Sequence, residues 1–191
     1  MNICVYCGSS SQVKPAYFEA ANRLGRIFAD EDIALVYGAG AVGLMGELAN
    51  SVLANGGRVT GIIPRFMVEE GWSHDKLENL LVTENMHERK HKMAEMADAV
   101  VALPGGCGTF EELLEIITWK QLGLFANPIV ILNIDGYFDP LLELMKRAVD
   151  ENFMRSEHAR MWQVVNLPDD VVPTIRETPQ WDVNYRKFAA I

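Results

Sequence analysis

Short apolar runs alternate with helix-forming segments along most of this chain, and the alternation restricts the folds open to it. The apolar runs are typical of strands, and the segments between them repeat apolar residues every three or four positions, as on one face of a helix. Strands separated by helices pair in parallel, with each helix crossing over one face of the sheet. The strand-like runs are 2–6, 33–37, 58–63, 99–103, 128–134 and, more weakly, 163–165. This pattern predicts an α/β fold, a doubly wound parallel sheet in three layers.

The helical segments and the length of the chain indicate a single domain. The period of a helix is present in segments 17–28, 44–53 and 113–117, and another helix is expected to start at Pro140. A chain of 191 residues is long enough to bury a sizeable core, and it holds no internal repeat or linker. We expect one domain over residues 1–191, with an irregular C-terminal tail from about Pro168.

Charge and apolar content argue against two classes of partner. The formal net charge is −9 and no basic stripe offsets it, so nucleic acid is not an expected partner. No apolar run approaches the roughly 20 residues that a membrane-spanning helix needs. The N-terminal residues lack the basic leader of a signal peptide, and we therefore expect a cytoplasmic protein that does not bind a membrane.

The three cysteines are too few for a disulfide framework. Cys4 and Cys7 have the spacing of a C-x-x-C redox motif, but Cys4 lies inside a strand-like run rather than at a helix start, where a thiolate is stabilised. A zinc site is not expected, because there is no second cysteine pair. We interpret these residues as structural cysteines and expect no metal.

Segment 104–109 (PGGCGT) joins the end of a strand-like run to a glycine-rich turn and a helix start. Free backbone N–H groups and the positive end of a helix dipole meet at such a junction. Glycine allows the backbone to approach an anion without a Cβ in the way. The turn therefore predicts a binding site for a phosphorylated ligand.

The acidic residue Glu112, just behind this turn, has two interpretations. Thr109 and Glu112 have the spacing of a capping box, in which both side chains bind early N–H groups of the helix. Spacing alone favours capping. A carboxylate beside a phosphate site is electrostatically unfavourable, however, and such an arrangement is more often retained for chemistry.

Two other segments match well-known motifs. Residues 38–43 (GAGAVG) match the dinucleotide pattern G-x-G-x-x-G, but no acidic residue near position 60 could bind a ribose. We interpret them as a nucleotide-facing turn, with tight packing of helix on strand as the alternative. Residues 87–91 (HERKH) match the zinc-protease pattern H-E-x-x-H, but no third ligand has recognisable spacing. A charged helix start, or cations that reach an anionic ligand, accounts for this segment better.

Several blocks in a fixed order resemble the Lonely Guy (LOG) family of cytokinin-activating nucleoside 5′-monophosphate phosphoribohydrolases, often labelled lysine decarboxylase-like. The blocks are VYCGSS at 5–10, VYGAG at 36–40, GLMG at 43–46, GIIP at 61–64, MHERK at 86–90, PGGCGTFEE at 104–112 and ITW at 117–119. The resemblance implies a Rossmann-like domain that works as a homodimer or higher homo-oligomer, with sites near the subunit interface. Two residues depart from the family pattern, since Ala39 replaces a usual glycine and Cys107 a common tyrosine.

The resemblance also implies roles for the matching residues. Arg89 and Glu112 would form the catalytic pair, and Gly106, Gly108 and Thr109 would bind the 5′-phosphate. Lys90 and Thr118 would line the ligand site, and Glu70 is the nearest match to a family glutamate. The full set of expected substrate-binding residues is Gly8, Ser9, Gly40, Glu70, Met86, Arg89, Lys90, Pro104, Gly105, Gly106, Cys107, Gly108, Thr109, Phe110, Glu111, Glu112 and Thr118.

The implied reaction is hydrolysis of the N-glycosidic bond of a cytokinin or adenosine nucleoside 5′-monophosphate, which gives the free base and ribose 5-phosphate. A carboxylate aimed at the ribose stabilises the developing positive charge and can orient or deprotonate water. Glu112 is assigned this role, with Glu111 as the alternative if the helix phase differs. Arg89, which cannot act as a base, would anchor ligand oxygens or stabilise the departing base.

No cofactor is expected, because no lysine is placed for pyridoxal phosphate chemistry. A protein of another class remains as the alternative: a non-catalytic carrier or sensor that holds a nucleotide or a molybdenum cofactor in the same phosphate-binding loop.

Overall fold

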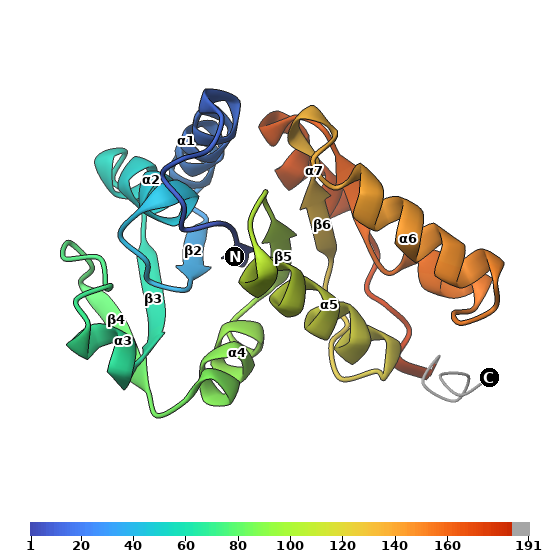
Figure 1. The fold of residues 1–191 in the computed structure, drawn as a ribbon. Coiled ribbons are helices and arrows are strands. Elements are labelled where there is room, and N and C mark those ends of the chain that lie inside the picture. The colour runs from blue at the N-terminus through green and yellow to red at the C-terminus, as the bar shows by residue number, and fades with distance from the viewer. Residues whose placement is uncertain (185–191) are drawn as a thin grey trace.

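Seven strands form one sheet in the computed structural model, which describes residues 1–184 (Figure 1). The order across the sheet is β4-β3-β2-β1-β5-β6-β7, and all neighbouring strands are parallel. The strands are β1 (Asn2–Tyr6), β2 (Ala34–Tyr37), β3 (Val59–Pro64), β4 (Asn79–Thr83), β5 (Ala99–Ala102), β6 (Ile129–Leu132) and β7 (Gln163–Val165). The predicted doubly wound α/β fold is confirmed.

Helices cover both faces of the sheet, which explains why the central strands are almost wholly apolar. The helices α1, α2 and α7 pack on one face, and α4, α5 and α6 pack on the other (Figure 1). Each face has its own apolar core: the first core lies under α1, α2 and α7, and the second lies under α4, α5 and α6. Within β1, Ile3 and Val5 enter the first core, while Cys4 and Tyr6 enter the second. The α-helices are α1 (Pro15–Asp30), α2 (Gly43–Ala54), α3 (Arg65–Glu69), α4 (Met86–Glu95), α5 (Cys107–Gln121), α6 (Asp139–Asp150) and α7 (Val171–Glu177).

The structure contains two elements, β4 and α3, that the sequence does not predict. β4 lies at the edge of the sheet and most of its residues are partly or fully exposed, so it lacks the continuous apolar run of the inner strands. α3 is five residues long and buries none of them, so it has no apolar face to reveal it. Sequence periodicity detects elements through their buried residues, and these two bury few or none.

The expectation of an irregular tail from Pro168 is wrong for its first part. A 3₁₀ turn (Pro168–Asp170) leads directly into α7, whose residues Val171, Val172 and Ile175 are buried in the first core. Pro173 lies in the first turn of α7, where the N–H that proline lacks has no helical partner to lose. Prolines in this segment therefore mark a helix start rather than irregular chain.

The carboxyl ends of all seven strands lie at one edge of the sheet, where ligands bind in folds of this kind. From β1 the chain adds β2, β3 and β4 on one side of β1, and it then adds β5, β6 and β7 on the other side. The strand order therefore reverses between β1 and β5. At this switch point the N–H of Gly8 donates to the carbonyl of Pro104 at 3.0 Å. The turns after β1 and β5 therefore meet where a site is expected.

We predict that Gly46→Ala in α2 lowers the free energy of unfolding by about 1–3 kcal/mol, because the helix packs against the preceding loop without room for a methyl group. A Cβ at this position would lie 2.2 Å from the carbonyl oxygen of Ala41. Urea denaturation followed by circular dichroism measures the change.

Gly108→Ala is the matched control, because a Cβ at Gly108 would meet no atom within 4 Å. Gly108 is also in a helix, where alanine is favoured by up to about 1 kcal/mol. Equal losses of stability in the two variants would contradict the packing argument.

Candidate functional site

A cavity of about 660 Å³ opens at the carboxyl edge of the sheet, next to the switch point. Its walls come from the segments that follow β1, β2, β3 and β5, together with side chains from α4 and α5. The lining residues are Cys7, Gly8, Ser9, Gly38, Gly40, Ala41, Val42, Met45, Ile63, Met67, Gly71, Trp72, Arg89, Gly106, Cys107, Gly108, Thr109 and Glu112. Nine residues expected in the substrate site from the sequence are therefore brought together.

The N-terminus of α5 points an unsatisfied set of backbone donors at this cavity. The helix begins at Cys107, its N-cap is Gly106, and no side chain caps it. Thr109 in the first turn is 3% exposed, and its hydroxyl has no hydrogen-bond partner within residues 1–184. Uncapped N–H groups, a helix dipole and a hydroxyl without a protein partner are the features of an anion site.

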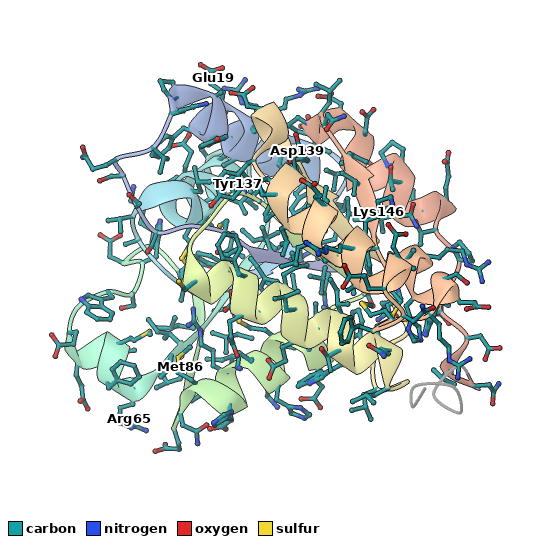
Figure 2. All side chains as sticks on the ribbon, turned by 45° about the vertical axis from the view of Figure 1, so that its right-hand side comes forward. Glu19, Arg65, Met86, Tyr137, Asp139 and Lys146 are labelled. Atoms are coloured by element: carbon teal, nitrogen blue, oxygen red, sulfur yellow. The ribbon has the colours of Figure 1, made fainter. Side chains whose placement is uncertain are left out.

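The glycine loop before α5 is fixed by contacts on the side that faces away from the larger cavity. The hydroxyl of Tyr137 donates to the carbonyl of Gly105 (Figure 2), and a Cβ on Gly105 would lie 2.1 Å from Oγ1 of Thr109. Pro104 and Gly105 line a separate, smaller cavity of about 300 Å³ on this side of the loop. Gly106 and Gly108, by contrast, have nothing within 4 Å of a built Cβ, so they leave the larger cavity open.

The capping-box interpretation of Thr109 and Glu112 is wrong. A capping box needs Thr109 at the N-cap, but the N-cap is Gly106, three residues earlier, and the helix begins at Cys107. Thr109 therefore lies within the first turn and Glu112 in the second. The carboxylate of Glu112 lines the cavity instead of binding an early N–H group.

Arg89 is held rigidly beneath the ends of two strands. Its Nε donates to the carbonyl of Ile62 at 3.1 Å, and one terminal nitrogen donates to the carbonyl of Gly38 at 2.9 Å. The guanidinium also explains the glycine at position 38, since a Cβ there would lie 2.0 Å from that nitrogen. Met86, at the start of α4 (Figure 2), places its sulfur 3.7 Å from the other terminal nitrogen. A guanidinium has five donors, so N–H groups remain for a ligand.

Glu112 carries the most perturbed carboxyl group in the cavity. Burial raises the pKa of Glu112 from 4.5 to about 7, with further upward contributions from Glu111 and Glu115, while the positive charges of Arg89 and Lys90 oppose the shift. Arg89 and Glu112 do not form an ion pair in this structure. A half-buried carboxyl group that changes charge near neutral pH is suited to general acid–base chemistry.

Glu111 and Lys90 lie outside the cavity and contact one another. The Lys90 ammonium forms ion pairs with Glu111 and, at 3.1 Å, with Glu115, so both carboxylates are turned away from the cavity. Neighbouring residues on a helix point about 100° apart, which accounts for the different environments of Glu111 and Glu112. The helix phase thus favours Glu112 over Glu111 as the residue that faces a ligand.

Three other expected residues also lie away from the cavity lining. Glu70 ends α3 and is exposed. Phe110 stacks on Tyr137, with ring centroids 6.4 Å apart. Thr118 is on the exposed face of α5, where its hydroxyl donates to the carbonyl of Leu114 at 2.8 Å.

The sequence does not predict the apolar end of the cavity, which consists of Val42, Met45, Ile63, Met67 and Trp72. Val42, Met45 and Ile63 lie within blocks that the sequence analysis singles out, but none of them is assigned to the ligand site there, and Met67 and Trp72 belong to no block. Their only signal is position, because loops after parallel strands face the ligand edge.

Of the two departures from the family pattern, Cys107 lines the cavity, while Ala39 is buried between the lining residues Gly38 and Gly40. Ala39 adopts a left-handed backbone (φ 60°) with its side chain fully buried, so alanine occupies a conformation that glycine adopts more easily. Its carbonyl accepts the N–H of His74 at 2.9 Å. Cys107 is exposed and lines the cavity wall.

Neither the H-E-x-x-H match nor the C-x-x-C match forms a metal or redox site among the described residues. Within HERKH, Glu88 accepts the N–H of Glu84 at 2.8 Å, while Asn85 caps α4 by accepting the N–H of Glu88, and both histidines are exposed. No group of three potential metal ligands occurs in residues 1–184. Cys4 and Cys7 are buried and unbonded to each other, and burial raises the pKa of both thiols, as expected for structural cysteines.

Glu112→Gln is predicted to stabilise the folded protein at alkaline pH. The native pKa of this carboxyl is above its ordinary value, so the folded state binds more protons and wild-type stability falls as pH rises from 4.5 to about 7. Glutamine removes that loss, which is on the order of 2 kcal/mol after allowance for partial solvent exposure. Urea denaturation at about pH 5 and about pH 8 should show the variant gaining stability over the wild type only at the higher pH. A constant difference would contradict the assignment.

Comparison with known proteins places the chain among relatives of defined activity. A family model described as "Possible lysine decarboxylase" matches residues 45–175. The cytokinin riboside 5′-monophosphate phosphoribohydrolase LOG2 of Arabidopsis thaliana is 45% identical over 167 residues, covering 87% of this chain and 78% of the relative. The cytokinin riboside 5′-monophosphate phosphoribohydrolase LOG of Oryza sativa subsp. japonica is 41% identical over 184 residues, covering 95% and 75%.

Solved structures share the fold at lower identity. The molybdenum cofactor carrier protein of Chlamydomonas reinhardtii superposes with a TM-score of 0.71 at 19% identity, covering 93% of this chain and 96% of that one. The molybdenum cofactor binding protein of Rippkaea orientalis gives 0.69 at 23% identity, covering 92% and 94%. These likenesses establish a common fold alone. The matches to curated relatives over most of the sequence show more: the chain belongs to the LOG family.

Proposed function

We propose that this protein hydrolyses the N-glycosidic bond of cytokinin or adenosine nucleoside 5′-monophosphates to the free base and ribose 5-phosphate. The observation that carries the proposal is the meeting of Glu112, Arg89 and the uncapped N-terminus of α5 in one cavity. Family membership supports the same reaction, because the curated relatives are named for it. We expect the enzyme to act in the cytoplasm, whose reducing conditions suit its free cysteines.

The phosphate end of the substrate would bind at the start of α5. The N–H groups of Gly106, Cys107 and Gly108 and the hydroxyl of Thr109 provide neutral donors, and the helix dipole favours a dianion there. Because this end of the substrate does not react, its binding energy serves to position the ribose.

Glu112 would act on the ribose carbon that bears the base. In its ionised form, the carboxylate stabilises the positive charge that develops as the glycosidic bond breaks and its electron pair leaves with the base. Water then forms the new C–O bond and gives its proton to Glu112, while the departing base takes a proton from solvent. The free N–H groups of Arg89 hold ligand oxygens and keep part of the Glu112 population ionised near neutral pH.

We predict that Glu112→Gln lowers kcat by about 10²–10⁴-fold with little change in KM for adenosine 5′-monophosphate, because the amide cannot accept a proton. In the wild type, kcat/KM should rise with pH through an apparent pKa near 7 and then level off, since the ionised form is the active one. Chromatography of released base over a pH series provides both measurements.

Glu111→Gln is the matched control, since Glu111 is adjacent in sequence but paired with Lys90 outside the cavity. Its loss of activity should be much smaller, and the reverse order would transfer the role to Glu111. Tight nucleotide binding with no base release by the wild type would overturn the enzyme and indicate a carrier.

We also infer that the protein assembles into a homodimer or a higher homo-oligomer through the outer face of α5. Leu114, Thr118 and Leu122 follow one another at four-residue intervals on that face, and both leucines are more than 40% exposed. If Thr118 contributes to a ligand site, as the family resemblance implies, that site must belong to a second copy, because Thr118 does not line its own chain's cavity.

The double variant Leu114→Glu/Leu122→Glu is predicted to be monomeric by sedimentation velocity, because two buried charges oppose association. Leu144→Glu is the control, since Leu144 is 64% exposed on the separate helix α6. If the control dissociates, or if the double variant remains an oligomer, the interface does not lie on the outer face of α5.

A further inference from the structure

A tryptophan with an open face stands at the apolar end of the cavity. Trp72 is 54% exposed and lines the cavity wall, although tryptophan side chains are mostly buried in proteins. Trp72 has no part in the proposed phosphate site or in the proposed chemistry. A large aromatic surface left open inside a cavity is a feature of ligand contact.

The backbone around Trp72 is fixed even though its side chain is exposed. The N–H of Trp72 donates to the carbonyl of Met67 at 3.0 Å, and the carbonyl of Trp72 accepts the N–H of Ala41 at 3.3 Å. An isolated antiparallel bridge joins Gly40 to Ser73 in the same place. The loop after β3 is thus tied to the loop after β2, and the indole is presented from a braced position at little cost in ordering on binding.

The cavity is arranged along the sheet edge in an order that matches the parts of a nucleotide. Trp72 follows β3, Arg89 binds the ends of β3 and β2, and the α5 N-terminus follows β5. β3 and β5 are separated by β2 and β1, a distance of about 14 Å for three strand spacings. An extended nucleoside monophosphate spans a comparable length, with its ribose near the middle.

The chemistry of the Trp72 end suits a base rather than a sugar or a phosphate. Its other lining residues, Val42, Met45, Ile63 and Met67, are uncharged and apolar. Among the residues of segment 1–184 that line the cavity, charged side chains are limited to Arg89 and Glu112. Methionine side chains adapt to ligands of different shape, so this end can accept a base with an apolar substituent.

We infer that Trp72 stacks on the base of the nucleotide and favours the larger purine rings over pyrimidines. The identity of the ligand as a nucleoside 5′-monophosphate rests on the proposed function, but contact between the base and Trp72 does not depend on whether the nucleotide is cleaved.

The test is binding by calorimetry in the Glu112→Gln background, where turnover does not interfere. Trp72→Ala should weaken adenosine 5′-monophosphate binding by about 5- to 150-fold, the usual effect of removing one base-stacking aromatic. Binding of ribose 5-phosphate, which has no base, should stay within about twofold. Trp72→Phe should keep most of the affinity, and cytidine 5′-monophosphate, with its smaller ring, should lose less than the adenosine nucleotide in Trp72→Ala.

Phe66→Ala is the matched control, because Phe66 is a 47% exposed aromatic on nearby α3 that does not line the cavity. Unchanged nucleotide affinity in Trp72→Ala, or equal losses of affinity for the nucleotide and for ribose 5-phosphate, would overturn the inference. Base release by the wild type would still support the proposed function in that case. Trp72-dependent binding without base release by the wild type would support the inference and defeat the proposed function. Absence of nucleotide binding would overturn both.

Discussion

The buried guanidinium of Arg89 is the contact on which the site depends. It joins α4 to the ends of β2 and β3 through two backbone carbonyls, and these bonds place a permanent positive charge at the carboxyl edge of the sheet. A buried charge is tolerable only with good partners, and carbonyl oxygens provide them without neutralising it. The glycine at position 38 follows from this contact, because any side chain there would displace the guanidinium. Arg89 therefore accounts for a glycine in the loop after β2 and limits the rise that burial causes in the pKa of Glu112.

Stability and chemistry conflict at several positions around the cavity. Glu112 is half-buried with no hydrogen bond from the described residues, the Thr109 hydroxyl has no protein partner, and α5 lacks a side-chain cap. Each feature forgoes a hydrogen bond within the protein that would have stabilised the folded state. All three also face the same cavity, where a ligand phosphate would accept hydrogen bonds from Thr109 and from the N–H groups of α5. The two apolar cores on either side of the sheet provide the stability that these open groups reduce.

Sequence patterns predict this fold well where burial is continuous and poorly where it is not. The inner strands are apolar on both faces and were all expected, whereas the edge strand β4 and the exposed helix α3 give no period. The glycine loop after β5 predicts an anion site because glycines at a helix start let backbone N–H groups approach an anion without a Cβ in the way. The start of α5 could not be fixed to the residue, and that error of three residues is what made Glu112 resemble a capping side chain.

The remaining site residues differ in how far sequence could assign them. Trp72 and Met67 reach the cavity through a loop pairing between Gly40 and Ser73, which no local pattern encodes. Lys90 belongs to a recognisable block, but its ion pairs with Glu111 and Glu115 depend on how α4 and α5 pack together. Contacts between elements distant in sequence are decided by tertiary packing, so motifs identify the residue and leave its partners open.

Glu112 shares α5 with the anion site at that helix's own N-terminus, and this arrangement links ligand binding to proton binding. A phosphate dianion at the start of α5 would repel the Glu112 carboxylate one and a half turns away, so the bound ligand favours the protonated form of Glu112. By reciprocity, protonation of Glu112 must strengthen the hold on the phosphate by the same factor. The helix that orients the two groups thereby makes the protein's affinity for a phosphorylated ligand a function of the acidity of its surroundings.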